Sequence, residues 1–162
     1  MQTRNPVNTK KVIGRRQVRY ETFDAILADA ERLATVPTQT LGNWSVGQIY
    51  CHLAKSAAVL IDGAPHGAPF PIQWVLRTFL KKRMLENTVS PGFQLPSQSA
   101  SLLPIATSTE DGLVLLRAAT ARIKQDANRA PRHPAFGPCT PEEWNAWHLR
   151  HCELHLSFIV AG

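Results

Sequence analysis

The stretch "TPEEWNAWHLRHCELHLSFIV", residues 140–160, combines the clearest helix start in the chain with three of its six histidines. Thr140 can cap the helix, Pro141 occupies the first helical position, and Glu143 completes a capping box with Thr140. A long helix is therefore predicted here, and it carries several imidazoles on an otherwise apolar side.

Start and stop signals predict two long helices in the first part of the chain. "TFDAILADAERLA" opens at Thr22 or Asp24 and repeats apolar residues at helical spacing. "SVGQIYCHLAKSAAVLI" begins with Ser45 and has Gln48 three residues later, a second capping box. The glycines and prolines of "DGAPHGAPFP" end this helix.

A third long helix is predicted over "STEDGLVLLRAATARIKQ", with Thr107 and Glu110 as its candidate capping box. Gly112 weakens its first turn. A shorter amphipathic helix is expected at about residues 71–85. The proline- and serine-rich residues 87–107 are expected to be an irregular loop, of a length typical of a lid or a site wall.

Four long helices without a competing sheet predict an all-α fold. We expect one domain over residues 1–162, built as a four-helix bundle with long connections and a short extra helix. Residues 1–20 are expected to form a basic N-terminal arm, in which only "RRQVRY" alternates as a strand would.

The composition is that of a folded globular chain. Its 44% hydrophobic content is ordinary, no run approaches the roughly 18 apolar residues of a membrane span, and no secretory signal is apparent. Three cysteines without C-x-x-C spacing argue against a disulfide scaffold or a cysteine zinc site. A reducing cytoplasm is the expected location.

The formal net charge of +6 is concentrated in two places. Residues 1–19 contain basic residues and no acid, and Arg77, Lys81, Lys82 and Arg83 cluster in "WVLRTFLKKRML". Either group could contact nucleic acid or anionic lipid. Because no nucleic-acid motif accompanies them, we expect a solvated tail, a solvated helix face and no specific nucleic-acid partner.

Three histidines share one face of the predicted last helix: His148, His151 and His155. At 100° per residue they fall within an arc of about 60°. Trp144 and Cys152 share that stripe, so it is expected to face the core. His52 lies with Ser56 on the inward face of the second helix. Two helices are thus expected to direct histidines into the bundle.

Clustered buried imidazoles need partners for both ring nitrogens and cannot all be protonated. A divalent cation resolves this by taking one nitrogen from each neutral ring. Two histidines on one helix and a third from a facing helix leave a tetrahedral corner open for water or substrate, as in catalytic sites. Spacing alone leaves two pairs feasible: His148 with His151, or His151 with His155.

The pairing of "WSVGQIYCHL" with "RHCELHLSF" resembles the DinB-like (YfiT-like) superfamily of bacterial four-helix-bundle metalloproteins. More narrowly, "VNTKKVIGRR", "LGNWSVGQIYCHLAKS", "HPAFGPCTPEEW" and "HLRHCELHLSF" are similar to a subfamily labelled a domain of unknown function. The resemblance extends over nearly the whole chain.

This resemblance implies a DinB-like bundle whose metal ligands are His52, His151 and His155, with His148 in a supporting or water-binding role. Many relatives have a further histidine where this chain has Leu154, so the hydrogen bond of that neighbour is in doubt. Characterised members of the superfamily include transferases and isomerases that use low-molecular-weight thiols.

Other reactive side chains are given lesser roles. Glu153 points about 160° away from His151 and is expected to be exposed or paired with a basic residue. His133 could reach the mouth of the bundle, and His66 is expected in a surface loop. Cys152 is interpreted as a small buried hydrophobe. The four tryptophans are expected to pack or to wall a pocket.

The sequence therefore predicts a protein that binds one divalent metal ion, zinc or nickel before iron or copper. The first hypothesis is a metal-dependent transferase or hydrolase acting on a small molecule, with a low-molecular-weight thiol as one candidate. The second is a non-catalytic module with the same site. A third is a basic protein that binds membranes or nucleic acid. A homodimer through exposed helix faces is also considered.

Overall fold

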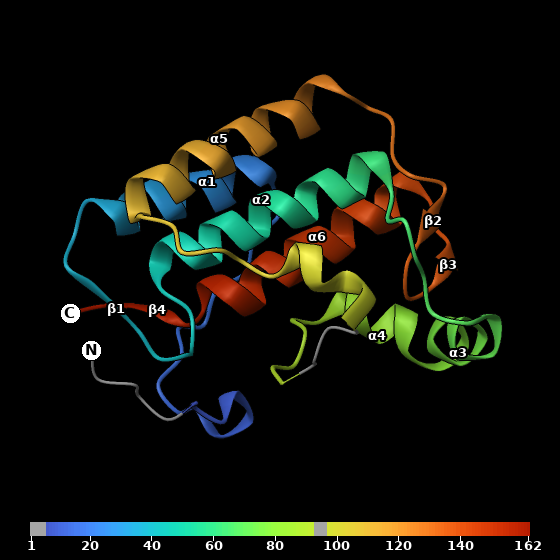
Figure 1. The fold of residues 1–162 in the computed structure, drawn as a ribbon, viewed down its shortest axis with the longest axis horizontal. Helices are drawn as coiled ribbons and strands as arrows, with labels where there is room; N and C mark the ends of the chain where they lie inside the picture. The colour runs from blue at the N-terminus through green and yellow to red at the C-terminus, as the bar shows by residue number, and fades with distance from the viewer. Residues whose placement is uncertain (1–5, 93–96) are drawn as a thin grey trace.

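Four long helices form the body of the protein, as their capping signals predicted (Figure 1). The structure is a computed structural model that describes residues 6–92 and 97–162. The helices are α1 (Phe23–Ala34), α2 (Val46–Asp62), α5 (Thr109–Gln125) and α6 (Pro141–Leu156). Helix α2 packs against both α5 and α6, and α1 contacts these same two helices from the other side.

The helix starts follow the side-chain chemistry closely. The side chains of Ser45 and Thr140 each accept a hydrogen bond from the backbone amide of the third residue of their helix. The side chains of Gln48 and Glu143 in turn accept from the backbone amide of the cap, so both predicted capping boxes form. The expected cap of α5 is wrong by one residue. Ser108, rather than Thr107, accepts from the amide of Asp111.

Helices α2 and α5 cross with their backbones in contact. A Cβ atom added to Gly47 would lie 2.2 Å from the carbonyl oxygen of Ser108, and one added to Gly112 would lie 2.6 Å from the carbonyl oxygen of Gly47. Gly112 was expected only to weaken a helical turn. Its role is instead to let the two helices approach, since any side chain would meet backbone atoms that cannot move aside.

Replacing either glycine with alanine is expected to destabilise the protein by about 1–3 kcal/mol because the core becomes overpacked. Helix propensity alone predicts the opposite sign, a gain of about 1 kcal/mol. Urea unfolding of Gly47→Ala and Gly112→Ala measures the change in free energy. A stabilised variant would contradict the contact.

The expectation of a purely α-helical fold is wrong in detail, because two small antiparallel sheets accompany the helices. Strand β1 (Thr38–Thr40) pairs with β4 (Ile159–Ala161), and β2 (Arg132–His133) pairs with β3 (Gly137–Pro138). Residues 15–20, which alternate as a strand would, are not in a strand. The last helix consequently ends at Leu156, and the chain turns into β4.

The short helix predicted at about residues 71–85 is present, but a π-helical turn interrupts it. It comprises α3 (Phe70–Val75), the π-helical turn η2 (Leu76–Leu80) and α4 (Lys81–Glu86). The expected solvated basic face is confirmed for Arg77, Lys82 and Arg83, which are exposed, but it is wrong for Lys81, which is buried. The expected 87–107 loop contains the 3₁₀-helix η3 (Ser97–Leu102), and its residues 93–96 lie outside the described part of the chain.

The basic N-terminal segment is only in part the solvated tail that the sequence suggested: Lys10 and Lys11 are exposed, and residues 1–5 lie outside the described part of the chain. A 3₁₀ turn, η1 (Thr9–Lys11), starts it, and the following residues lie against the helices. Arg16 forms a bidentate pair with Asp29 of α1 at 3.0 and 2.6 Å. Arg15 donates to the hydroxyl of Ser157. Three of the expected free cations are thus engaged, since Arg19 also donates to the backbone carbonyl of Glu86.

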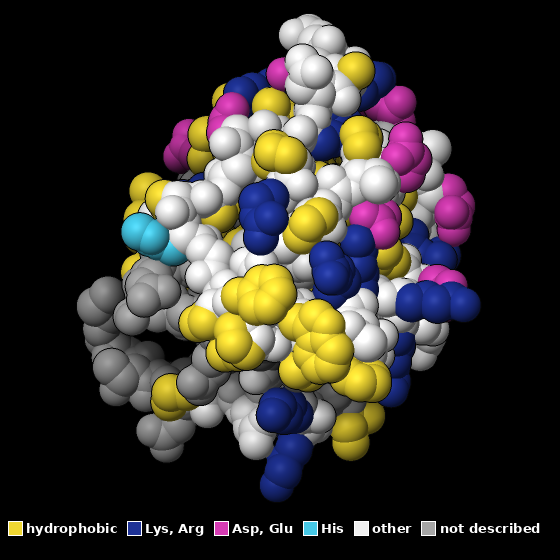
Figure 2. Space-filling model, turned by 90° about the vertical axis from the view of Figure 1, so that its right-hand side faces the viewer, with side chains coloured by type: hydrophobic (Ala, Val, Ile, Leu, Met, Phe, Trp, Pro, Cys, Tyr) yellow, Lys and Arg dark blue, Asp and Glu magenta, His cyan; other side chains and the backbone are white. Residues whose placement is uncertain are grey.

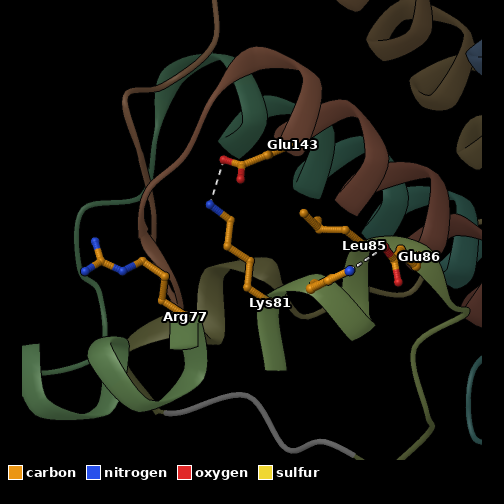
Figure 3. Close-up of a pocket in the computed structure, with 6 residues that line it drawn as sticks. Arg77, Lys81, Leu85, Glu86 and Glu143 are labelled. Atoms are coloured by element: carbon orange, nitrogen blue, oxygen red, sulfur yellow. Dashed lines mark ion pairs between the residues drawn. The ribbon is translucent and has the colours of Figure 1, made fainter. Parts of the chain in front are cut away.

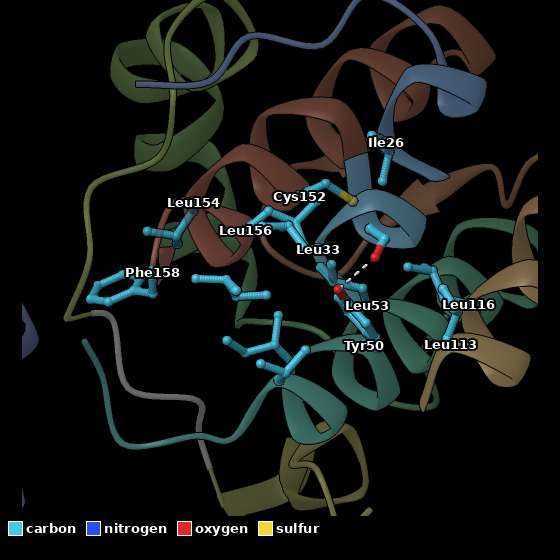
Figure 4. Packing of buried hydrophobic residues seen from close by; sticks show 14 of the residues in the cluster. Ile26, Leu33, Tyr50, Leu53, Leu113, Leu116, Cys152, Leu154, Leu156 and Phe158 are labelled. Carbon is cyan, nitrogen blue, oxygen red and sulfur yellow. Dashed lines mark hydrogen bonds between the residues drawn. The ribbon is translucent and has the colours of Figure 1, made fainter. Parts of the chain in front are cut away.

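The main core lies where α1, α2, α5 and α6 meet (Figure 4). Leu33, Leu53 and Leu156 are fully buried there, and the hydroxyl of Tyr50 donates to the carbonyl of Ala30 at 2.9 Å. A second cluster surrounds Trp144 at the other end of α6. Among the described residues, no helix has the length and hydropathy that a membrane crossing requires.

Candidate metal centre

Helices α2 and α6 bring three histidines together. His52 lies in the middle of α2, and His151 and His155 lie one turn apart near the end of α6. Both helices have complete capping boxes and pack against each other, so the positions of the three side chains are set by rigid elements.

The three Nε2 atoms converge. His52 Nε2 lies 3.2 Å from His151 Nε2, which lies 2.9 Å from His155 Nε2. One ligand atom from each of these residues lies within 4.8 Å of the others. Tetrahedral bonds of about 2.0–2.1 Å to one ion would separate two nitrogens by roughly 3.3 Å. Small adjustments of the rings would therefore suffice for all three to bind one ion.

The hydrogen bond of His52 fixes which of its nitrogens faces the cluster. Its Nδ1 lies 2.8 Å from the backbone carbonyl of Leu102, which can only accept. Nδ1 therefore carries the proton in the neutral ring, and Nε2 presents a lone pair toward His151. This carbonyl-to-imidazole contact is the arrangement that orients histidine ligands in metal sites.

Burial keeps the cluster neutral. Desolvation lowers the pKa of His52, and it lowers the pKa values of His151 and His155 well below the ordinary value, with further lowering from the neighbouring imidazoles. Neutral imidazole is the form that binds a metal ion. The buried Nδ1 of His151 has no hydrogen-bond partner among the described residues.

Two tryptophan rings border the cluster. Trp44 stacks on His155 with ring centroids 5.3 Å apart, and Trp147 stacks on His151 at 5.8 Å. His52 is buried, whereas His151 and His155 are only half-buried. The cluster thus has aromatic walls on two sides, and His151 and His155 retain some exposure. Tryptophans as pocket walls were expected, but these two were not singled out.

The other residues considered from the sequence lie outside this convergence. His148 packs against Phe23, and its ring centroid is 6.2 Å from that of His151. Burial lowers its pKa to about 4. Ser56 donates its hydroxyl to the carbonyl of Leu53 in its own helix. Neither side chain has a hydrogen bond to the three histidines in the described structure.

His133 lies in an aromatic cluster that meets the histidine cluster at Trp147. Its ring stacks on Phe136 at 4.5 Å and contacts Trp144 and Trp147. Its Nδ1 accepts from the amide of Ala135, and burial lowers its pKa to about 3. The indole of Trp144 donates to the carbonyl of Ala130. These two residues therefore pack the far end of α6, and His133 is linked to the histidine cluster through their shared neighbour Trp147.

Cys152 and Glu153 follow the ligand His151 in sequence, and the sequence predicted the burial of the first but not of the second. Cys152 is buried, and desolvation raises the pKa of its thiol, in line with a packing role. Glu153 was expected to be exposed or paired. It is fully buried and pairs with Arg150 at 3.0 Å. Helix wheels missed this burial because the face opposite the histidines is covered by residues distant in the sequence.

The fold and the cluster define a mostly helical protein with three convergent histidines that could hold a metal ion. The sequence profile of the family described as "Protein of unknown function (DUF1569)" matches residues 12–161, so the chain belongs to that family. No curated protein and no solved structure matches the chain.

Proposed function

We propose that His52, His151 and His155 bind one divalent metal ion and that the protein is a metal-dependent transferase or hydrolase of the DinB-like kind. The convergence of three Nε2 atoms from two helices is the observation that supports this most directly. Zinc or nickel suits such imidazole ligation, with iron or copper as alternatives. Three protein ligands leave a position for substrate, of which a low-molecular-weight thiol is one candidate.

A bound divalent ion would supply Lewis acidity, which lowers the pKa of a water or thiol. The chain's own residues would orient the histidine ligands and shield them from solvent. The Leu102 carbonyl holds the His52 ring in one tautomer. Trp44 and Trp147 cover the rings of His155 and His151, and a small molecule would reach the ion from the partly exposed side of these two histidines.

A non-catalytic ligand-binding module is the second candidate. No carboxylate joins the three-histidine group among the described residues, and Glu153 is turned away and engaged with Arg150. The part of the chain that the structure describes thus places no acidic side chain to carry protons at the cluster. Unless a thiol substrate itself supplies the reactive group, this arrangement favours ligand binding without turnover.

Elemental analysis of purified protein tests the shared part of both candidates. Wild type and the exposed-loop control His66→Ala are expected to retain about one metal ion per chain, and His151→Ala to retain none. Metal at about 100 times its dissociation constant should raise the free energy of unfolding by about 2.7 kcal/mol in the first two proteins only. Equal metal content in all three would reject the site.

A further inference from the structure

The helical segment from α3 to η2 has an unusual orientation, because its large apolar side chains face outward. Neither α3 nor η2 contains a buried residue. Six of the 13 exposed large hydrophobic residues in the described chain fall between positions 70 and 80. We call these six the outer apolar face: Phe70, Ile72, Trp74, Val75, Phe79 and Leu80.

Exposure on this face is large for aromatic residues, at 74% for Phe70 and 68% for Phe79. Figure 2 shows hydrophobic side chains gathered on the end of the molecule where α3 lies, with lysine and arginine side chains around them. Contiguous apolar patches of this kind mark interaction surfaces, because exposed aromatics otherwise cost free energy in water.

Polar residues of the same segment face the protein instead. Lys81 is only 9% exposed and pairs with Glu143 of α6 at 2.6 Å (Figure 3). The side-chain NH2 group of Gln73 donates to the carbonyl of Pro134, and the side-chain oxygen of Gln73 accepts from the guanidinium of Arg132. These contacts attach the segment to the body through its polar groups, and they hold the outer apolar face toward solvent.

The charged residues within the segment that carries the outer apolar face are all basic, and the nearest acids are Glu86 and Glu143. Residues 63–85 contain four basic residues and no acid. Arg77 and Arg83 are exposed, and neither has an ion-pair partner among the described residues. Lys82 is exposed as well and lies 3.9 Å from Glu86. A partner that buries this face must therefore accept both aromatic side chains and positive charge.

We propose that the outer apolar face docks on the surface of an anionic lipid bilayer. Tryptophan and phenylalanine beside lysine and arginine are the side chains that interfacial helices insert at the boundary between headgroups and acyl chains. The segment lies along the surface of the protein, so Phe70, Trp74 and Phe79 can enter this boundary while Arg77 and Arg83 meet lipid phosphates.

The same charges disfavour a second copy of this chain as the partner. In a two-fold interface each surface meets itself. Arg77, Lys82 and Arg83 of both copies would then gather in one interface, at an electrostatic cost that an anionic bilayer does not impose. The docking surface does not include the three histidines, so the membrane proposal is independent of the proposed metal site.

Co-sedimentation with vesicles tests the proposal. The full-length protein is expected to bind vesicles of equimolar phosphatidylcholine and phosphatidylglycerol, and to bind phosphatidylcholine alone much more weakly. The triple variant Phe70→Ser, Trp74→Ser and Phe79→Ser should lose at least about tenfold in partition coefficient. The control Val114→Ser with Leu115→Ser removes exposed apolar residues of α5 and should bind like wild type.

A second pair of variants separates charge from apolar contact. Arg77→Gln with Arg83→Gln should lose roughly fivefold per charge. Arg117→Gln with Arg122→Gln removes the same net charge from α5 and should lose much less. Emission of Trp74, taken as the difference from Trp74→Phe, should shift to shorter wavelength with anionic vesicles.

Three results would overturn the proposal: no binding to anionic vesicles, equal binding by wild type and the triple serine variant, or equal losses in the two arginine pairs. Self-association in sedimentation that the triple variant abolishes would assign the face to a second copy instead. Circular dichroism checks that each variant is folded, and the exposed positions make unfolding unexpected.

Discussion

Glu153→Ala is expected to lower the free energy of unfolding by about 3–5 kcal/mol, because it leaves the buried Arg150 without its counter-charge. Both side chains are almost fully buried. Glu153 also accepts from the amide of Tyr20 at 2.8 Å and from the hydroxyl of Thr88 at 2.6 Å. One carboxylate thus joins α6 to the N-terminal segment and to the start of the 87–107 connection.

A double variant separates charge from shape. Arg150→Met with Glu153→Gln removes both charges, keeps an acceptor oxygen for the amide of Tyr20 and supplies an NH2 group that can donate to the hydroxyl of Thr88, so it should be clearly more stable than Glu153→Ala. Urea unfolding gives the free energies. Glu86→Ala, on the exposed end of α4, serves as the control and should be unchanged. A loss below about 1 kcal/mol in Glu153→Ala would contradict an essential ion pair.

The helices were predictable because short-range side-chain hydrogen bonds determine where they start. Ser45 with Gln48, and Thr140 with Glu143, act over three residues, and the structure contains both boxes. The cap of α5 was missed since Thr107 and Ser108 are equivalent by type and spacing. Strands β1 and β4 were missed because each has three residues and the partner is more than 100 positions away.

The histidine cluster was predictable in part. Helical spacing gives the shared face of His148, His151 and His155 but does not choose between pairs. The choice depends on where α2 crosses α6, and His52 meets the later pair. The contact with the Leu102 carbonyl could not be anticipated, because any backbone carbonyl of the connection could have occupied that place.

Burial of charged groups was the least predictable feature. Lys81 and Glu153 both occupy positions that helical wheels assign to solvent. Each is covered by a segment from elsewhere in the chain: Lys81 by the start of α6, and Glu153 by residues near Tyr20 and Thr88. Sequence periodicity reports on one helix at a time, so it cannot show which second element covers a polar face.

Acidification from pH 7 to pH 5 is expected to destabilise the metal-free protein by several kcal/mol. Burial lowers the pKa of His133 to about 3 and that of His148 to about 4. Below pH 6.5 these two histidines therefore bind protons in the unfolded chain but not in the folded chain. The free energy of unfolding consequently falls as the pH falls. At pH 5 each of the two histidines contributes about 2 kcal/mol to this loss.

His133→Asn isolates one of these contributions, because an asparagine oxygen can still accept from the amide of Ala135. The variant should be less stable than wild type at pH 7, since the ring contacts with Phe136 and Trp144 are lost. Between pH 7 and pH 5, however, it should lose about 2 kcal/mol less than wild type. Urea unfolding with a chelator present measures the slope, and His66→Asn should match wild type. Asp29 does not contribute within this pH range. Burial raises the pKa of its carboxyl, but hydrogen bonds from Arg16 and Tyr20 lower it further, to about 2. Parallel slopes for His133→Asn and wild type would show that the His133 ring is protonated or solvated in the folded protein.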